Sequence, residues 1–182
     1  MIFSVKKLVA AAVIGALYAA LTLVLAPIAY GPLQFRVSEV LCILPFFFPA
    51  SAVGLTIGCV IANLLGPSAG ILDIVFGSFA TLLAGICTAA IGMRARQRGS
   101  ASWGAEIAAC FMPVLFNAPI IGAVLAYTLT PNLSPETFWA SFFTFGAQVA
   151  LGEAVVMFAL GLPSMRYLSK SPVLRELLDK LK

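Results

Sequence analysis

Five long apolar stretches, broken by isolated polar residues, constrain the fold of this chain more than any other feature. Of its 182 residues, 62% are hydrophobic and 10% are charged, and the mean hydropathy is +1.06. A soluble domain carries about 25% charged residues, so this chain has too few to cover a surface that faces water. The sequence therefore predicts an all-α integral membrane protein whose single membrane domain covers residues 1–182.

A few polar side chains nevertheless lie inside the apolar stretches. Each one costs several kcal/mol in hydrocarbon unless it finds a partner, so its presence needs an explanation. These residues are therefore the candidates for a functional role: Glu39, Asn63, Asp73, Asn117, Gln148 and Glu153.

A transmembrane helix needs about 20 apolar residues, and six segments are candidates. The stretch 37–65 is too long for one ordinary span. Pro45 and Pro49 interrupt it, and a proline inside a helix removes a backbone hydrogen bond. We interpret it as two short helices joined by a turn near residues 49–51. The predicted spans of this six-helix bundle are 8–25, 37–48, 51–65, 71–93, 105–129 and 138–162.

The basic residues indicate how the bundle is oriented. Of the 11 Lys and Arg residues, ten lie near the N-terminus, in the loop at 94–98 or after residue 165, and the other is Arg36. Six spans place those three regions on one side, whereas five would separate the loop from the C-terminus. The positive-inside rule then predicts that both termini are cytoplasmic. The tail at 169–182 is predicted to be an amphipathic helix on the inner membrane surface or on a partner.

The composition and motifs argue against several function classes. The basic residues flank apolar stretches, which favours topology signals over a nucleic-acid patch. The chain has no histidine and no CxxC pair, so zinc and haem sites are not expected, nor is any other cofactor. Neither a catalytic set nor an ATP-binding motif is legible, so we expect no enzyme, and any ATPase must be another subunit. Four cysteines are interpreted as buried small hydrophobes: Cys42, Cys59, Cys87 and Cys110.

The first span carries alanines at four-residue spacing, Ala12, Ala16 and Ala20. Small residues at this spacing clear one helix face, so that another helix backbone can approach closely. The approaching helix can belong to this bundle or to a partner membrane protein. Spacing alone does not separate the two interpretations.

The segment from Gln34 to Glu39 is the densest polar constellation. Arg36 and Glu39 are three residues apart at a predicted helix start, close enough to pair on one face. One interpretation is therefore a capped helix end that neutralises itself. The alternative is a carboxylate directed at a ligand, with Arg36 and the Gln34 amide completing the contacts.

The remaining polar residues fall at two predicted depths. Asn63 and Asp73 flank a turn and are expected at a depth similar to that of Glu39, in the outer half of the bilayer. Asn117 lies between two prolines, where a bent backbone can line a cavity. Glu153, with Gln148 before it, is expected nearer the cytoplasmic end. A buried carboxylate of this kind is either a ligand-binding group or a structural hydrogen-bonding group, and both remain open for Glu153 and Gln148.

These segments together resemble the QueT family. The resemblance covers nearly the whole chain and is most specific between residues 26 and 80. It is carried by the run Ala26–Glu39, by Leu44–Pro49, Gly54–Cys59, Ala62–Leu64 and Asp73–Ser78, and by Asn117-Ala118 and Leu151-Gly152-Glu153.

The resemblance implies a substrate-binding S-component of an energy-coupling-factor (ECF) transporter, assigned to queuosine precursors. It implies partners, namely a transmembrane coupling subunit and two cytoplasmic ABC-type ATPases, in the plasma membrane of a prokaryote. In such S-components, alanines of the first helix mark the surface that meets the coupling protein. Ala12, Ala16 and Ala20 match that pattern.

The ligand implied by the resemblance is a 7-deazaguanine, in its cyano or aminomethyl form or as queuine. A guanine-type edge presents an N–H beside an amino group, which a carboxylate accepts in bidentate fashion. We hypothesise that Glu39 or Asp73 reads that edge, with Glu153 as a second choice. The remaining contacts are assigned to Gln34, Arg36, Asn63 and Asn117, and a ring-stacking role to Phe35, Phe46 or Phe47.

Two other functions remain open. An S-component for another vitamin would have the same fold, since fold does not fix substrate. A stand-alone carrier of a small polar solute would use Glu153 and Asp73 as proton or cation sites. An intramembrane enzyme is a weaker third reading.

Overall fold

The computed structural model describes residues 4–31, 33–67, 70–99, 102–131 and 134–180, and within these ranges every regular element is helical. The all-helical expectation is therefore confirmed for the described residues. Its elements are α1 (Val5–Val24), α2 (Ala26–Ala29), η1 (Val37–Phe46), α3 (Ser51–Leu65), α4 (Ile71–Gln97), α5 (Trp103–Leu129), α6 (Pro135–Val156), η2 (Met157–Gly161), α7 (Leu162–Lys170) and α8 (Pro172–Lys180).

Four helical segments among the described residues are long and apolar enough to cross a membrane. They are Val5–Val24, Ile71–Gln97, Trp103–Leu129 and the continuous segment Pro135–Lys170. Val37–Phe46 and Ser51–Leu65 are apolar but shorter. The count of six spans and the cytoplasmic placement of the termini stay predictions.

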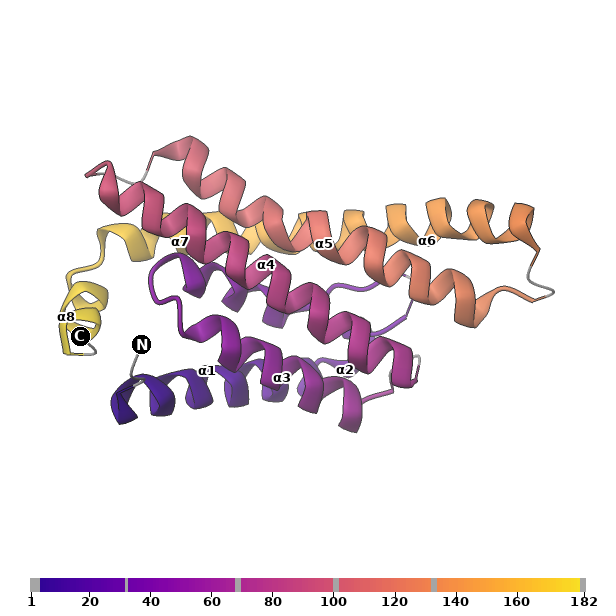
Figure 1. Cartoon of the computed structure of the whole chain (residues 1–182), viewed down its shortest axis with the longest axis horizontal. Coiled ribbons are helices and arrows are strands. Elements are labelled where there is room, and N and C mark those ends of the chain that lie inside the picture. The colour runs from indigo at the N-terminus through magenta and orange to yellow at the C-terminus, as the bar shows by residue number, and fades with distance from the viewer. Residues whose placement is uncertain (1–3, 32, 68–69, 100–101, 132–133, 181–182) are drawn as a thin grey trace.

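The long helices run side by side along the molecule (Figure 1). They pack in succession, α1 on α3, α3 on α4, α4 on α5 and α5 on α6, and η1 packs against α1 and α4. The start of α1, the end of α4 and all of α8 lie at the same end of the bundle (Figure 1). This end carries most of the basic residues of the chain.

The backbones of helices α1 and α3 are in direct contact where the two helices cross. A Cβ atom added to Gly15 would lie 2.3 Å from the Gly54 carbonyl oxygen, and one added to Gly54 would lie 2.0 Å from that of Ala11. Glycine is therefore required at both positions, because any side chain would collide with the facing backbone. This crossing buries Ala11, Gly15 and Ala19, which form one small-residue face of α1.

The proline-interrupted stretch folds into two helices, of which the first differs from expectation. Residues 37–48 are expected to form an ordinary helix, whereas η1 is a 3₁₀-helix over Val37–Phe46, with Pro45 inside it. A 3₁₀-helix rises about 2.0 Å per residue against 1.5 Å for an α-helix. Ten residues of η1 therefore cross more of the bundle than an α-helix of the same length.

The last long helix extends beyond its expected end at residue 162. A π-helical turn, Met157–Gly161, joins α6 to α7, and the helical segment continues to Lys170. Pro163 lies in the first turn of α7, and a widened turn before it accommodates the missing backbone N–H. Ser169 and Lys170 consequently belong to α7, and the amphipathic tail helix α8 begins at Pro172.

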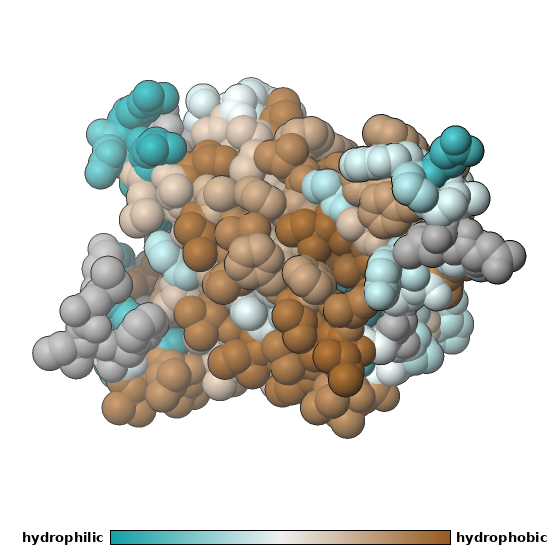
Figure 2. Space-filling view, turned by 45° about the vertical axis from the view of Figure 1, so that its right-hand side comes forward, coloured by the Kyte–Doolittle hydropathy of each residue, from teal (hydrophilic) through white to brown (hydrophobic). Residues whose placement is uncertain are grey.

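The exterior of the bundle is apolar. Large hydrophobic side chains such as Leu8, Ile71, Leu115 and Phe143 are exposed. Figure 2 shows hydrophobic residues covering the middle of one face, with hydrophilic residues gathered toward its edges. A soluble monomer rarely exposes so large an apolar area, because contact of apolar side chains with water is unfavourable. In a membrane these side chains would contact lipid instead.

Candidate ligand-binding site

Six polar side chains from five parts of the fold are buried in the bundle. Each is at most 7% exposed, and together they are called the polar cluster: Arg36, Glu39, Asn63, Asp73, Asn117 and Glu153. They come from the start of η1 and from α3, α4, α5 and α6. Asn63 donates to the Asp73 main chain, and Glu39 and Asp73 both act electrostatically on Arg36, so these residues lie in one region of the fold. Their depth in the bilayer and their binding of a ligand stay predictions.

Glu39 is held by two neighbours. The Tyr18 hydroxyl of α1 donates a hydrogen bond to Oε1, and the Cys42 thiol donates to Oε2 at 2.9 Å. Glu39 and Tyr18 are both at most 1% exposed. Each carboxylate oxygen can accept more than one hydrogen bond, so these contacts fix the orientation of Glu39 without using all its capacity.

Arg36 contacts neutral groups rather than Glu39. Its Nε lies 3.5 Å from the Ala29 carbonyl oxygen, its Nη1 lies 3.9 Å from Cys59 Sγ, and its guanidinium lies 5.3 Å from the centre of the Tyr30 ring. Ion pairs within 4 Å are found elsewhere in the described structure, at Glu106–Arg166 and Glu176–Lys180. No side chain caps the start of η1, and the Glu39 carboxylate acts electrostatically on Arg36 from beyond ion-pair distance, so both interpretations of residues 34–39 stay open.

Asn63 and Asp73 meet at the contact between α3 and α4. The Asn63 amide donates to the Asp73 main-chain oxygen at 3.3 Å and to Cys59 Sγ at 3.5 Å. Gly77 lies on the same face of α4, one turn after Asp73. A Cβ atom at Gly77 would lie 3.0 Å from Asn63 Nδ2 and 3.6 Å from Asp73 Oδ1, so this glycine leaves room beside both polar groups.

Glu153 faces the cluster from α6. Its side chain lies near the Asn117 amide of α5, and the charged groups that act on it are Glu39 and Arg36. Its Oε1 atom is buried without a hydrogen-bond partner among the described residues. The expectation that Glu153 lies at a separate depth from Glu39 is therefore wrong. The helical segment continues to Lys170, which places Glu153 18 residues after Pro135 and 17 before Lys170.

The segment before η1 enters the bundle against α6. A Cβ atom at Gly152 would lie 2.0 Å from the main-chain oxygen of Gln34, so glycine lets the two backbones touch. Gln34 and Phe35 are partly buried there, and the Gln34 amide donates to the Gly31 carbonyl at 3.1 Å. Gln148 Oε1 is a further buried oxygen without a partner in the described structure.

The suggested stacking roles of Phe46 and Phe47 do not fit their positions. The two rings pack edge to face, 5.1 Å apart. Phe46 is 2% exposed inside an apolar cluster with Met157 and Met165. These contacts separate both rings from the polar cluster, and Phe35 is the aromatic residue left beside it in the chain.

Several polar contributors are not predicted from the sequence. Tyr18 lies within the apolar first span, and its hydroxyl contacts Glu39. Thr22 and Ser38 share a hydrogen bond of 2.6 Å that ties α1 to η1. Cys42 and Cys59 act as hydrogen-bonding groups rather than as inert hydrophobes. The available signal for the cysteines was their spacing, three residues after Glu39 and four before Asn63.

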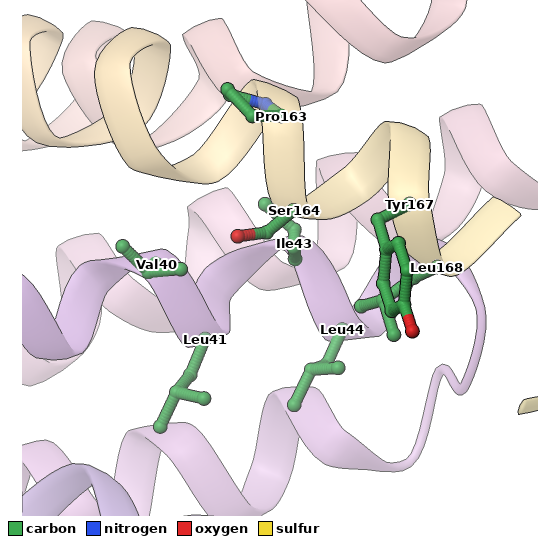
Figure 3. A pocket seen from close by; sticks show the side chains of 8 residues that line it. All are labelled: Val40, Leu41, Ile43, Leu44, Pro163, Ser164, Tyr167 and Leu168. Atoms are coloured by element: carbon green, nitrogen blue, oxygen red, sulfur yellow. The ribbon is translucent and has the colours of Figure 1, made fainter. Parts of the chain in front are cut away.

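Three hollows on the structure are lined by other residues. One of about 510 Å³ lies between η1 and α7, and Figure 3 shows the side chains around it. Another, of about 620 Å³, is lined by apolar residues of α4, α5 and α6, including Phe76 and Tyr127. The third, of about 470 Å³, lies by Arg94 and Arg98 at the end of α4. None of the three is lined by the polar cluster.

The alanines singled out in the first span lie outside the bundle. Ala12, Ala16 and Ala20 are exposed, whereas Ala11 and Gly15 contact α3. Packing within this bundle therefore does not account for the exposed alanine face, which is defined by residues 12, 16 and 20.

The apolar exterior, the long helices and the buried polar cluster define a multi-pass helical membrane protein that holds polar groups inside it. The model of the QueT transporter family matches residues 8–170, and the chain belongs to this family. A curated protein of Lactococcus lactis subsp. cremoris (strain MG1363), "Queuosine precursor transporter QueT", is 42% identical over 78 residues. That segment is 42% of this chain and 45% of the relative, so less than half of the relative's length is matched. No solved structure matches the chain.

Proposed function

We propose that this protein is the substrate-binding S-component of an ECF-type importer and that it captures a 7-deazaguanine precursor of queuosine from outside the cell. The polar cluster is the observation that carries the proposal. Buried polar side chains from five parts of the fold contribute to it, and polar groups gathered in hydrocarbon need a function that offsets their cost. Membership of a transporter family and the name of the 42%-identical relative supply the substrate class.

The residues of the polar cluster are proposed to divide the recognition of the base among them. Asp73, beside the Asn63 amide and the space left by Gly77, accepts the N–H and amino group of the guanine-type edge. Asn63 and Asn117 complete the hydrogen bonds of the ring. Glu39 is held in place by hydrogen bonds from Tyr18 and Cys42. Its proposed role is to position the other polar groups of the cluster, and it does not bind the guanine-type edge by itself. The segment that directly precedes η1 is proposed to lie against the ligand, through Gln34, Phe35 and Arg36.

The exposed alanine face is proposed as the surface for the transmembrane coupling subunit. Ala12, Ala16 and Ala20 leave a shallow strip on α1 that a partner helix approaches closely. Two ABC-type ATPases complete the importer. The basic end of the bundle, with the start of α1, the end of α4 and α8, is proposed to face the cytoplasm of a prokaryotic cell, where the ATPases act (Figure 1).

The identity of the ligand is tested by mass spectrometry of small molecules that purify with the detergent-solubilised protein. We expect a 7-deazaguanine from the wild type and its loss from an Asp73→Ala, Asn63→Ala double variant that still elutes as a folded protein. A different vitamin in the wild type would show an S-component of other specificity. No bound base, together with no binding of added 7-deazaguanines, would contradict the proposal.

The partner surface is tested by Ala16→Leu, with Ala147→Leu as a matched control on an exposed face of α6. We expect Ala16→Leu to abolish uptake and assembly with the coupling subunit while ligand affinity in detergent is unchanged. The Ala147→Leu variant should take up ligand normally. Equal uptake by both variants would rule out the alanine face as the docking surface.

A second candidate, a stand-alone carrier driven by protons or cations, is favoured by the buried Oε1 of Glu153, which has no hydrogen-bond partner among the described residues. The two functions differ in their energy source. Uptake that persists without ATPase subunits and collapses with the proton gradient would identify the carrier.

A further inference from the structure

Two arginines at the basic end of the bundle line a hollow together with the start of the next helix. The hollow has a volume of about 470 Å³, within the range of about 300–1,000 Å³ that is usual for small-ligand sites. Arg94 and Arg98 line it from the end of α4, and Ser102 and Gly104 line it from the start of α5. The two helix ends lie together at the end of the bundle that carries α8 (Figure 1).

The positive charge of this hollow has no counterpart within the described structure. Neither Arg94 nor Arg98 forms an ion pair or a side-chain hydrogen bond with another described residue. Arg96, which lies between them in the chain, is engaged inside the bundle, because its guanidinium donates to the Phe46 carbonyl. Glu106, the acid in the first turn of α5, is already paired with an arginine of α7. The hollow is therefore positively charged, and the positive end of the α5 helix dipole adds to that charge.

The surface next to the hollow, toward the middle of the bundle, is apolar. Ile91 of α4 lines the hollow one turn before Arg94. On α5, Ile107 and Phe111 follow Gly104 at three and seven residues, so they lie on the same helix face, and both are exposed. A positive hollow at the end of two apolar helix faces is complementary to a phospholipid. Its phosphate would contact the arginines, and its acyl chains would lie along α4 and α5.

We propose that the hollow between the end of α4 and the start of α5 binds the phosphate headgroup of an anionic phospholipid. Basic pockets between membrane-spanning helices at the cytoplasmic side are a known kind of headgroup site. An arginine guanidinium donates two N–H groups to phosphate oxygens in charge-assisted hydrogen bonds. A zwitterionic lipid carries an ammonium group that balances its phosphate, so two arginines favour a lipid with a net negative charge. The site lies apart from the polar cluster and does not depend on which solute the protein carries.

The test is native mass spectrometry of the purified full-length protein in detergent, with dioleoylphosphatidylglycerol and dioleoylphosphatidylcholine added separately. The two lipids have the same acyl chains and differ in net charge. Each arginine near a lipid phosphate should contribute roughly fivefold in affinity, so we expect the wild type to bind one phosphatidylglycerol at least about tenfold more tightly than phosphatidylcholine. The double variant Arg94→Gln, Arg98→Gln should lose this preference. The double variant Lys6→Gln, Lys170→Gln removes the same charge from exposed lysines of α1 and α7, and it should keep the preference.

Inorganic phosphate distinguishes a lipid site from a site for a soluble anion. It lacks the acyl chains that would contact Ile107 and Phe111, so it should bind at least about tenfold more weakly than phosphatidylglycerol. Phosphate binding as tight as that of the lipid would overturn the lipid assignment. Equal affinity of the wild type for the two lipids would overturn the proposal without reference to the folding of any variant. Equal phosphatidylglycerol affinity in the two double variants would also overturn it, and each of these results leaves the proposed transport function standing.

Discussion

The bundle holds two buried acidic sites that differ in how their charge is balanced. At one, Glu106 of α5 is fully buried, and the Arg166 Nε of α7 lies 2.9 Å from its Oε2. This contact is ionic, because the N–H is not aligned for a hydrogen bond. Ser169 donates to the other oxygen at 3.0 Å, and the guanidinium stacks 3.5 Å from the Trp103 ring centre. One acid meets one base, and their contacts join α5 to α7.

The polar cluster also contains acidic and basic side chains, but in a different ratio. Three carboxylates share one guanidinium, and the closest partners of Glu39 are a phenol and a thiol. Glu106 has its counter-charge within the protein, and the pair links α5 to α7. In the function proposed above, the polar cluster takes further partners from a bound solute. We therefore expect changes at Glu106 to act on stability and changes in the polar cluster to act mainly on binding.

Glu106→Ala gives the largest expected effect. Glu106 is fully buried and Arg166 is 25% exposed, so removing the carboxylate leaves a partly desolvated guanidinium without its counter-charge, which costs about 3 kcal/mol of folding free energy. The change should lower the thermal midpoint of the detergent-solubilised protein by several degrees. Any variant that remains folded should bind ligand normally. A loss of affinity without loss of stability would make the Glu106 site part of the ligand site and break the comparison.

Tyr18→Phe should have an intermediate effect, because it removes the hydroxyl that donates to Glu39 without creating a cavity. Loss of a hydrogen bond to a buried carboxylate costs about 2 kcal/mol. We expect a lower thermal midpoint and weaker ligand binding, since Glu39 loses its fixed orientation. Tyr127→Phe, at an exposed tyrosine of α5, is the control. Identical melting and affinity in the two variants would show that Tyr18 does not position Glu39.

Gly77→Ala should have the smallest effect, confined to binding. The new methyl group would lie 3.0 Å from the Asn63 amide nitrogen, which must move by a few tenths of an ångström. Alanine also favours the helix by about 1 kcal/mol, which offsets this strain in the stability of the protein. Ligand affinity should fall about fivefold with an unchanged thermal midpoint. Gly104→Ala is the control, because its new methyl group would lie 4.0 Å from the nearest neighbouring atom, and it should leave affinity unchanged. Equal affinities in the two variants would place the ligand away from Asn63 and Gly77.

The sequence alone was sufficient for the helical class and for most of the polar cluster. Apolar stretches fix where helices form, and polar residues within them stand out because hydrocarbon offers them no water. Glu39, Asn63 and Asp73 were therefore recognised as residues that meet inside the protein. Ala12, Ala16 and Ala20 were recognised as a small-residue face, but their exposure became visible in the fold alone.

Other features depended on tertiary context. The depth of Glu153 was misjudged because a π-helical turn before Pro163 lets the last helix continue, and no local rule announces that turn. The 3₁₀ winding of η1 arises in a short segment packed between longer helices. The interpretation in which Arg36 pairs with Glu39 assumes an α-helical start. In the fold, Arg36 precedes η1 and reaches Tyr30 and Cys59 instead.

The central claim is that the polar cluster, and not the Glu106 site, binds a solute. The most direct measurement is a pair of calorimetric titrations of 7-aminomethyl-7-deazaguanine into Asp73→Ala and Glu106→Gln proteins, each set against the wild type. The account predicts one-to-one binding by the wild type, a loss of at least tenfold in affinity for Asp73→Ala, and wild-type affinity for Glu106→Gln despite its lower thermal midpoint. Wild-type affinity in a folded Asp73→Ala protein, or an equal loss in both variants, would contradict it.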